Sequence, residues 1–194
     1  MKRFKIILLI SCIHFSGCHY ISNDAADIFN MEIDTFLIKE KSVGKLKIGM
    51  SFKKVKEIYK NFDFETDSAF IYGFDGEGTG TLIKKNETDY LFCVGDESDE
   101  KVRFIVCLNS KYHTKSGIRP GIDAKKLKSV YPGIRIVKSM ENDSESAFLE
   151  DSKVSCIFEY DPNKPVGVYA NPMEDSPETD NFRDDARIYS IMVY

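Results

Sequence analysis

The chain has 194 residues, 42% of them hydrophobic and 30% charged, and its formal net charge at pH 7 is −4. A polypeptide of this length can bury the core of one domain or of two small ones. Its acidic balance argues against nucleic-acid binding, because that function requires a basic surface opposite the phosphates.

The N-terminus has the pattern of a secretory signal. The first five residues, MKRFK, carry three positive charges and no acidic residue, and the ten-residue apolar stretch IILLISCIHF follows. That stretch is too short to span a bilayer, which takes about 20 apolar residues. A basic start, a short apolar core and small residues before a cleavage point are typical of a signal peptide. We therefore expect residues 1–17 to be removed, which changes the formal net charge from −4 to −7.

The segment HFSGC, residues 14–18, resembles the lipobox of bacterial lipoproteins, in which the cysteine is acylated and becomes the new N-terminus. That family prefers leucine where this chain has Phe15. The resemblance implies lipidation of Cys18 and a location in the bacterial cell envelope, where several acyl chains hold the protein to the membrane. His19 in place of an aspartate favours the outer membrane if the host is Gram-negative. The alternative is an ordinary signal peptide cut elsewhere, which leaves Cys18 as a thiol.

Two windows of the sequence repeat at a constant offset of 72 positions: VGKLKIGMSFKKVKEIYKN, residues 43–61, and KSGIRPGIDAKKLKSVYPG, residues 115–133. Each contains a glycine, which permits a left-handed backbone, and then a residue that can cap a helix, Ser51 or Asp123. Apolar residues at helical spacing follow in both copies. The pattern predicts one short amphipathic helix in each window.

Runs rich in β-branched and aromatic residues, separated by polar turns, follow each predicted helix. The expected strands are residues 68–74, 80–85, 89–94 and 101–108, and then 146–151, 153–160 and 186–194. The sequence therefore predicts an α+β fold of two tandem repeats, each a helix packed on antiparallel strands. Repeat 1 comprises residues 41–110 and repeat 2 residues 111–194, and residues 18–40 are interpreted as a tether from the lipidated cysteine.

The segments IGMSFKKVKEIY, residues 48–59, and RPGIDAKKLKSVYPG, residues 119–133, resemble the repeat of BamE (SmpA/OmlA)-like lipoproteins, which is also the tandem unit of the β-lactamase-inhibitory proteins. The motif is structural, and a fold does not define a function. Members of this group bind proteins. The resemblance therefore implies a protein-binding module, either inhibitor- or immunity-like or an envelope-assembly accessory, and not an enzyme. The alternatives are a small envelope hydrolase and a purely structural lipoprotein without a discrete ligand.

Lysines crowd the first turns of both predicted helices, at Lys53, Lys54, Lys125 and Lys126. The helix dipole disfavours cations at this end of a helix. The shared pattern indicates either a solvated face common to both copies or a basic stripe that faces an acidic partner or lipid headgroups.

The segment 160–185 is rich in proline, asparagine and aspartate and is predicted to be a long surface loop. We expect Tyr160, Tyr169 and Phe182 to be exposed there beside acidic residues. Aromatic side chains at a charged rim suit a protein contact. The alternative is an ordinary variable loop with no partner.

Residues with catalytic or metal-binding chemistry are sparse. His113 is predicted to be a partly exposed loop histidine, without the positioned partners that a catalytic base requires. Cys93, Cys107 and Cys156 include no CxxC pair and are predicted to be small buried hydrophobes, with one disulfide as the alternative. No catalytic residue, metal ion or cofactor is therefore expected.

Overall fold

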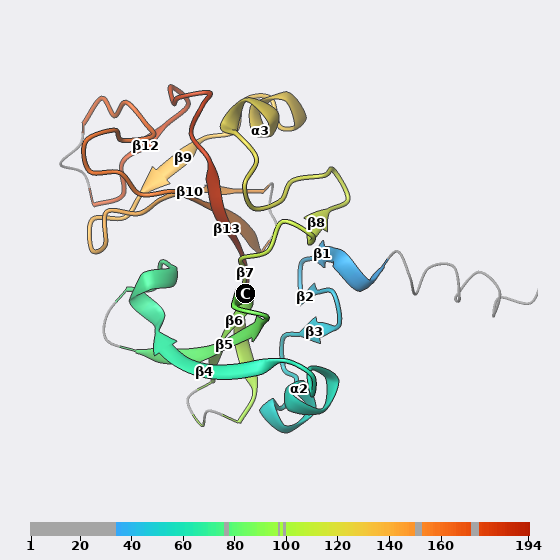
Figure 1. Ribbon diagram of the computed structural model, residues 1–194. Helices are drawn as coiled ribbons and strands as arrows, with labels where there is room; N and C mark the ends of the chain where they lie inside the picture. The colour runs from blue at the N-terminus through green and yellow to red at the C-terminus, as the bar shows by residue number, and fades with distance from the viewer. Residues whose placement is uncertain (1–33, 76–77, 97, 99, 150–152, 172–174) are drawn as a thin grey trace, which may run out of the picture. The chain divides into compact units, whose positions relative to one another are not determined.

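The computed structural model describes residues 34–194 except residues 76–77, 97, 99, 150–152 and 172–174 (Figure 1). The described residues belong to one compact unit, residues 33–194. The predicted signal peptide, Cys18 and most of the predicted tether lie outside the described residues. Within the described part of the chain, no helix combines the length and the apolar character needed to cross a membrane.

A nine-stranded antiparallel sheet forms the centre of this unit. In spatial order its strands are β12 (Glu178–Thr179), β9 (Ile136–Lys138), β10 (Glu145–Phe148), β11 (Val154–Phe158), β13 (Ile188–Val193), β7 (Val102–Cys107), β6 (Thr88–Gly95), β5 (Thr79–Lys85) and β4 (Asp63–Ser68). Strands β7 and β13 pair with each other, with Cys107 opposite Ile191. The first half of the chain therefore forms one side of the sheet and the second half forms the other.

Two helices of similar construction precede these two sets of strands. Helix α2 (Phe52–Ile58) begins after Ser51, and helix α3 (Ala124–Val130) begins after Asp123. Each of these two side chains accepts a hydrogen bond from the backbone N–H three residues further on, which satisfies one of the free donors of the first turn. Both helices lie in the windows where the repeated pattern predicts them.

The chain enters both helices through a glycine with a positive φ. Gly49 has φ 81° and Gly121 has φ 87°, a conformation that glycine adopts with little strain. The backbone N–H of Gly49 donates to Val102 O, and that of Gly121 donates to Ile188 O, both at 2.7 Å. These hydrogen bonds attach the start of each helix to the last strand of its own half of the chain.

A second, four-stranded sheet lies at the N-terminal end of the described residues. Its order is β3 (Leu46–Lys47), β2 (Ser42–Val43), β1 (Leu37–Lys39) and β8 (His113–Thr114), and a short 3₁₀-helix, η1 (Asp34–Phe36), precedes β1. Ile38 on β1 is only 4% exposed and belongs to the main hydrophobic core. Residues 34–40, interpreted from the sequence as the end of the tether, are therefore part of the fold.

The nine-stranded sheet has one covered face and one open face. On β6, Leu91 and Cys93 point into a core shared with α2, α3 and the four-stranded sheet, whereas Phe92 points to the opposite side. Among the described residues, this second side, which we call the open face, packs against the 3₁₀-helix η2 (Ala69–Tyr72) and neighbouring aromatic residues. Side chains alternate between the two faces because the period of a β-strand is two residues.

The predicted α+β class is confirmed, but the strand predicted at residues 68–74 is wrong. Strand β4 ends at Ser68, and η2 follows it. The apolar run by itself predicts a strand, yet Ala69 and Tyr72, three residues apart, are its two buried members, as the spacing of a 3₁₀-helix requires. Each of the other predicted strands overlaps an observed one, namely β5, β6, β7, β10, β11 and β13.

Candidate binding cleft

The floor of the open face is aromatic. Phe92 is fully buried, and its ring stacks on Tyr72 with a centroid distance of 3.9 Å. The ring of Phe74 lies 6.4 Å from that of Phe92 and 5.2 Å from that of Phe104, and Phe104 in turn lies 6.2 Å from Tyr194. These contacts connect the first half of the chain to its last residue in one continuous aromatic layer.

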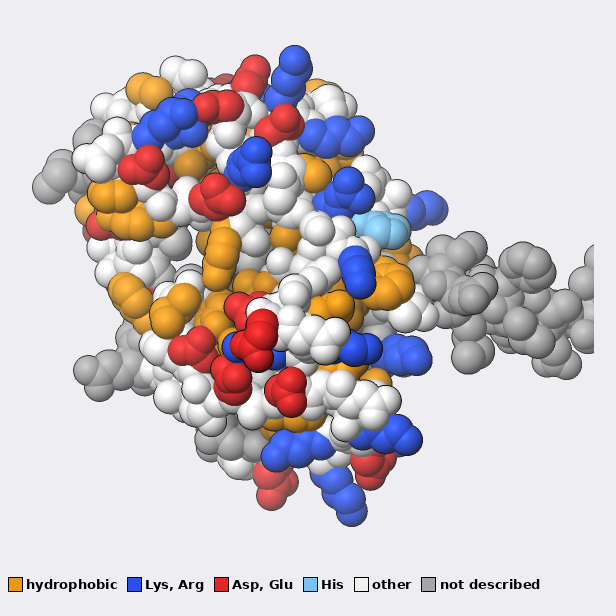
Figure 2. Space-filling model, viewed as in Figure 1, with side chains coloured by type: hydrophobic (Ala, Val, Ile, Leu, Met, Phe, Trp, Pro, Cys, Tyr) orange, Lys and Arg blue, Asp and Glu red, His pale blue; other side chains and the backbone are white. Residues whose placement is uncertain are grey.

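Exposed apolar side chains stand on both sides of this floor. From the first half, η2 presents Phe70 and Ile71, which are 52% and 57% exposed. From the second half, the turn between β9 and β10 presents Met140, and the segment after β11 presents Tyr160, which is 62% exposed. Figure 2 shows hydrophobic side chains gathered on the left of the view, where the two halves meet.

Two adjoining hollows lie between these walls. One, of about 860 Å³, is lined by Phe70, Ile71, Tyr160 and Tyr189 among others. The other, of about 630 Å³, extends over the aromatic floor past Met140. Across the two walls, Asn142 Nδ2 donates to Asp75 Oδ1 at 2.8 Å. We refer to the two hollows together as the cleft.

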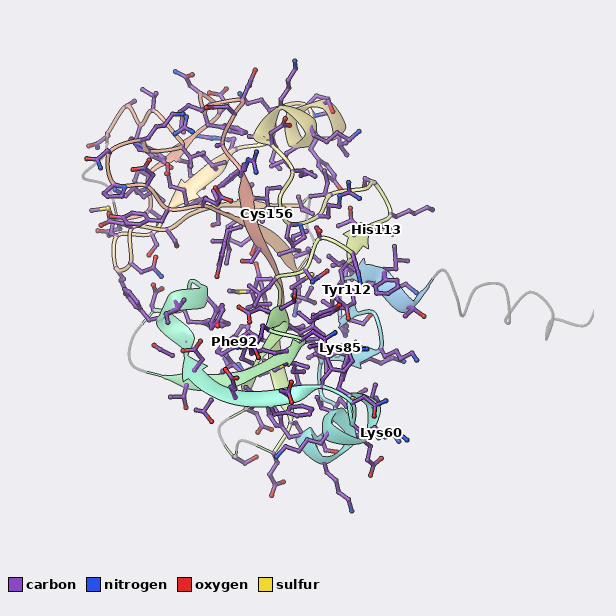
Figure 3. The ribbon with its side chains drawn as sticks, in the orientation of Figure 1. Lys60, Lys85, Phe92, Tyr112, His113 and Cys156 are labelled. Atoms are coloured by element: carbon purple, nitrogen blue, oxygen red, sulfur yellow. The ribbon has the colours of Figure 1, made fainter. Side chains whose placement is uncertain are left out.

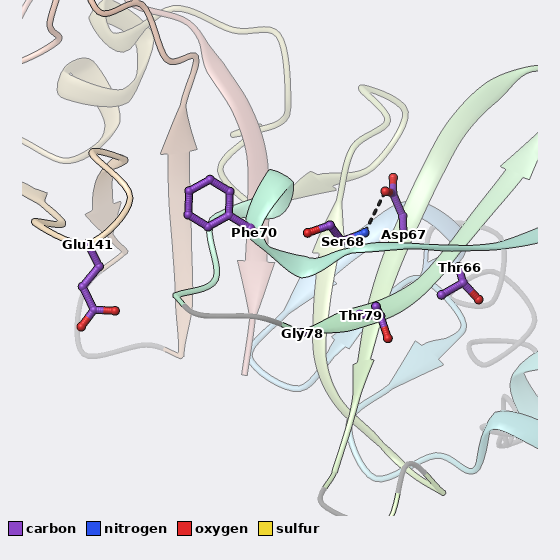
Figure 4. Close-up of a pocket in the computed structure, with 7 residues that line it drawn as sticks. All are labelled: Thr66, Asp67, Ser68, Phe70, Gly78, Thr79 and Glu141. Atoms are coloured by element: carbon purple, nitrogen blue, oxygen red, sulfur yellow. Dashed lines mark hydrogen bonds between the residues drawn. The ribbon is translucent and has the colours of Figure 1, made fainter.

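Acidic side chains surround the cleft. Those that line it are Asp75, Glu141, Asp143, Glu159 and Asp175. Among the described lining residues Lys138 is the one cation, and its ammonium group pairs with Asp143 at 2.8 Å, a hydrogen bond that raises the pKa of Lys138. A third hollow at the ends of β4 and β5 adds Asp67 to this acidic rim (Figure 4). The rim is therefore net negative.

Asp67 connects the acidic rim to the aromatic floor. Its Oδ2 accepts a hydrogen bond from the Tyr72 hydroxyl at 2.7 Å, and its Oδ1 accepts one from the Ser68 backbone N–H at 2.8 Å. Burial is the main cause of the raised pKa of Tyr72, and the hydrogen bond from its hydroxyl to Asp67 raises this pKa further. Figure 4 shows that the hollow beside Asp67 is bounded by Phe70 from the first half of the chain and Glu141 from the second.

One buried carboxylate fastens the loop of residues 160–185 to the sheet. Glu145 on β10 is 8% exposed, and its Oε2 accepts from the Val166 backbone N–H at 2.6 Å. Its Oε1 accepts from the Gly167 N–H at 2.7 Å and from the Tyr169 hydroxyl at 2.8 Å. Burial, followed by this last hydrogen bond, raises the pKa of Tyr169. The loop is therefore packed against the sheet near Val166, which the sequence did not predict.

Asp185, at the end of the same loop, accepts from Lys164 Nζ at 2.7 Å and from Arg183 Nε at 2.9 Å. These two cations hold its pKa at about 2, below the ordinary 3.8. Because the pKa is lowered on folding, the interaction stabilises the fold above pH 3.8 and is lost as pH falls through about 2.

We expect an NMR titration of the Asp185 carboxyl to show a midpoint near pH 2, and we expect Lys164→Gln to raise this midpoint. An ordinary midpoint in the unmodified protein would contradict this arrangement.

The structure does not bring the predicted lysines together into one stripe. Lys53 and Lys54 are exposed on α2, and Lys125 and Lys126 are exposed on α3. The two helices lie at opposite ends of the view in Figure 1. Lys54 also forms an ion pair with Glu57 at 3.0 Å, and both side chains are largely in solvent.

Of the three aromatic residues predicted to form an exposed edge, only Tyr160 is largely exposed, and it lies at the cleft. Phe182 is 4% exposed, because it packs on Phe158 and under the ammonium group of Lys128, whose Nζ lies 4.2 Å from the ring centroid. Tyr169 is half-buried against Glu145. The prediction of an exposed edge is therefore wrong for Phe182 and Tyr169.

The three described cysteines, Cys93, Cys107 and Cys156, are buried free thiols, as the sequence predicts. Burial raises the pKa of all three. His113 lies on β8 of the four-stranded sheet, where its Nδ1 is 3.0 Å from Thr114 O. Figure 3 shows His113 well separated from Phe92 and therefore from the floor of the cleft.

The sequence did not single out most of the residues that form the cleft. Phe70 and Ile71 are in a run read as a strand, and Met140 and Glu141 are in a turn without a recognisable motif. Nothing in the sequence around Glu145 distinguishes it from an ordinary surface glutamate. Only the acidic and aromatic composition around Tyr160 pointed toward this part of the surface.

Comparison with known proteins finds a solved structure of similar fold but no matching family. No family model matches the sequence, and no curated protein matches it. Among solved structures, the fold is similar to the crystal structure of the uncharacterized protein yfeY from Escherichia coli, with a TM-score of 0.53 and 14% sequence identity over 81% of this chain and 98% of that chain. At this identity the likeness concerns the fold alone, so any function has to be inferred from the cleft itself.

Proposed function

We propose that this protein is a lipid-anchored binding protein of the bacterial cell envelope that holds another protein in the cleft. The observation that carries the proposal is the cleft itself, in which exposed apolar side chains from both halves of the chain surround an aromatic floor. Exposed apolar patches rimmed by polar residues mark protein interaction sites. Tyrosine, phenylalanine and methionine are also the residue types enriched at the centres of such interfaces.

The charge of the rim favours a basic partner. Acidic residues outnumber cations around the cleft, and the one lining cation among the described residues, Lys138, is already paired with Asp143. A positively charged protein that presents an apolar protrusion would complement both the rim and the floor. Complementary charge of this kind speeds association and excludes unsuitable partners.

We also infer that the two halves of the chain are tandem copies of one BamE-like unit. Each half contains a glycine-preceded, capped helix followed by antiparallel strands of the large sheet, four in the first half and five in the second. Matching hydrogen bonds from Gly49 and Gly121 to the last strand of each half support a common origin. Proteins of that group bind other proteins, either as inhibitors or as accessories in envelope assembly, and both roles agree with the proposed cleft.

The lipid anchor at Cys18 would attach this binding module to the membrane, and the outer membrane is favoured in a Gram-negative host. Replacing Cys18 with alanine is expected to release the protein from the membrane fraction. Whether the bound protein is inhibited or assembled depends on its identity, which a crosslinking experiment would establish.

Site-specific photocrosslinking in cells tests the cleft. A photoreactive amino acid in place of Ile71 is expected to give one dominant, saturable adduct with a basic protein, which mass spectrometry would identify. The same amino acid in place of Val168, which is 64% exposed on the loop and is not among the cleft-lining residues, is the matched control. With the purified partner, Phe70→Ala and Tyr160→Ala are each expected to weaken binding by about tenfold or more, as for anchor residues of other interfaces. Equal adduct patterns from both positions, or none, would contradict the proposal.

A further inference from the structure

Positive charge is concentrated at the N-terminal end of the described chain. Residues 34–60 contain eight lysines and three acidic residues, a net charge of +5, whereas residues 61–194 have a net charge of −9. The described part of this acidic protein therefore begins with a basic segment. This segment includes strands β1, β2 and β3 of the four-stranded sheet.

The strand register sorts this small sheet into an apolar side and a basic side. Residues directly opposite each other in antiparallel strands point to the same face. The inner row across β1, β2 and β3, buried in the main core, is Ile38, Val43 and Leu46. The outer row is Lys39, Ser42 and Lys47.

The two turns of the same sheet add further lysines. Lys41 and Lys45 are exposed in the β1–β2 and β2–β3 turns. Neither these two nor Lys47 forms an ion pair with another described residue. We call Lys39, Lys41, Lys45 and Lys47 together the basic face. Figure 2 shows Lys and Arg side chains along the right-hand edge of the view, where β1, β2 and β3 lie in Figure 1.

The basic face lies close in sequence to the expected lipid anchor, and it is on the side of the large sheet opposite the cleft. Only 15 residues, 19–33, lie between Cys18 and Asp34, so a lipid on Cys18 holds this sheet within roughly 55 Å of the bilayer even if the intervening chain is fully extended. Phe36, at the end of η1, is 37% exposed and packs edge-on against Tyr112. Phenylalanine and lysine are among the residues that bind proteins to the membrane interface. The sheet packs on the covered face of the large sheet, and the cleft lies on the open face.

We propose that the basic face docks on anionic phospholipid headgroups of the membrane that holds the anchor, with Phe36 at the headgroup level. This contact turns the cleft away from the bilayer and toward its protein partner. The orientation rests on the proposed lipid anchor, but the affinity of the basic face for anionic lipid does not. Lysines within a Debye length of an anionic surface are attracted to it, and this attraction is lost at high salt.

Vesicle binding without the anchor tests the proposal. The protein used is residues 18–194 with Cys18→Ser, which contains every described element, and the vesicles are equal parts phosphatidylglycerol and phosphatidylcholine or phosphatidylcholine alone. We expect binding to the anionic vesicles at low salt only. Because each lysine near an anionic surface strengthens binding about fivefold, the triple variant Lys41→Gln, Lys45→Gln and Lys47→Gln is expected to bind about a hundredfold more weakly.

Two further triple variants separate the basic face from net charge and from folding. Replacement of the same three lysines by arginine keeps the charge and is expected to keep the binding. The matched control removes three charges from the second half of the chain, by Arg135→Gln, Lys153→Gln and Arg187→Gln, and is expected to bind like the parent. Equal binding of the parent to both kinds of vesicle would overturn the proposal, as would an equal loss in the matched control. No protein partner is present in this assay, so its outcome is independent of whether the cleft binds one.

Discussion

Replacing Glu145 with alanine is expected to lower the free energy of unfolding by about 4 kcal/mol, because it leaves several buried donors without an acceptor. The carboxylate is 8% exposed and accepts hydrogen bonds from Val166 N–H, Gly167 N–H and the Tyr169 hydroxyl. Water does not readily replace it, since Val166 and Gly167 are themselves buried. Urea unfolding of the purified protein would measure the change.

Milder substitutions at this site and a control at an exposed glutamate test whether the loss of stability comes from these buried hydrogen bonds. Glu145→Gln retains the size and one acceptor oxygen, and is expected to lose about half as much stability as the alanine variant. Tyr169→Phe removes a single donor and is expected to cost about 1 kcal/mol. Glu159→Ala, at an exposed carboxylate nearby in the sequence, should change stability by less than about 0.5 kcal/mol. A loss at Glu145 no larger than at Glu159 would show that the carboxylate does not hold the loop.

The second large effect is expected at the floor of the cleft. Phe92→Ala should lower the free energy of unfolding by about 3–5 kcal/mol, because the removed ring leaves a cavity in a closely packed layer. Phe92 is fully buried and stacks on Tyr72. Near-UV circular dichroism should also decrease, since the rings of Tyr72 and Phe74 lose their packed neighbour.

The matched control for Phe92 is another phenylalanine of the same sheet. Phe148, on β10, is 46% exposed, so Phe148→Ala is expected to change stability by no more than about 0.5 kcal/mol. Phe92→Leu keeps most of the volume and should cost less than about 1.5 kcal/mol. Similar losses for Phe92→Ala and Phe148→Ala would mean that the aromatic floor is not a packed core.

Together, the two sites describe how the cleft is built. The aromatic layer around Phe92 forms its floor, and Glu145 anchors the loop that begins at Tyr160, one of its exposed aromatic residues. Neither residue points into solvent, so neither is expected to touch the partner directly. Their substitution should therefore weaken partner binding through stability, whereas substitution of Phe70 should weaken it without unfolding the protein.

Local patterns in the sequence were sufficient for the parts of the fold that depend on neighbouring residues. The caps at Ser51 and Asp123, the helical spacing of apolar residues and most strands of the large sheet were predicted, because each depends on contacts within a few positions along the chain. The short strands β1, β2, β8, β9 and β12 were not predicted, since two or three residues are too few to display a period. The expectation of a signal peptide and of a lipid on Cys18 also rests on the sequence alone.

The tertiary structure decided which of the predicted residues lie together. The burial of Phe182 under Lys128 and the contact between Glu145 and Val166 join residues that are 54 and 21 positions apart, and no local pattern encodes such pairs. The cleft forms because β7 and β13 pair at the centre of one sheet and place η2 opposite the β9–β10 turn. The sequence by itself therefore determined the two helices, most strands of the large sheet and the expected anchor. The surface that can bind a partner depends on long-range strand pairing, which brings the two halves of the chain together.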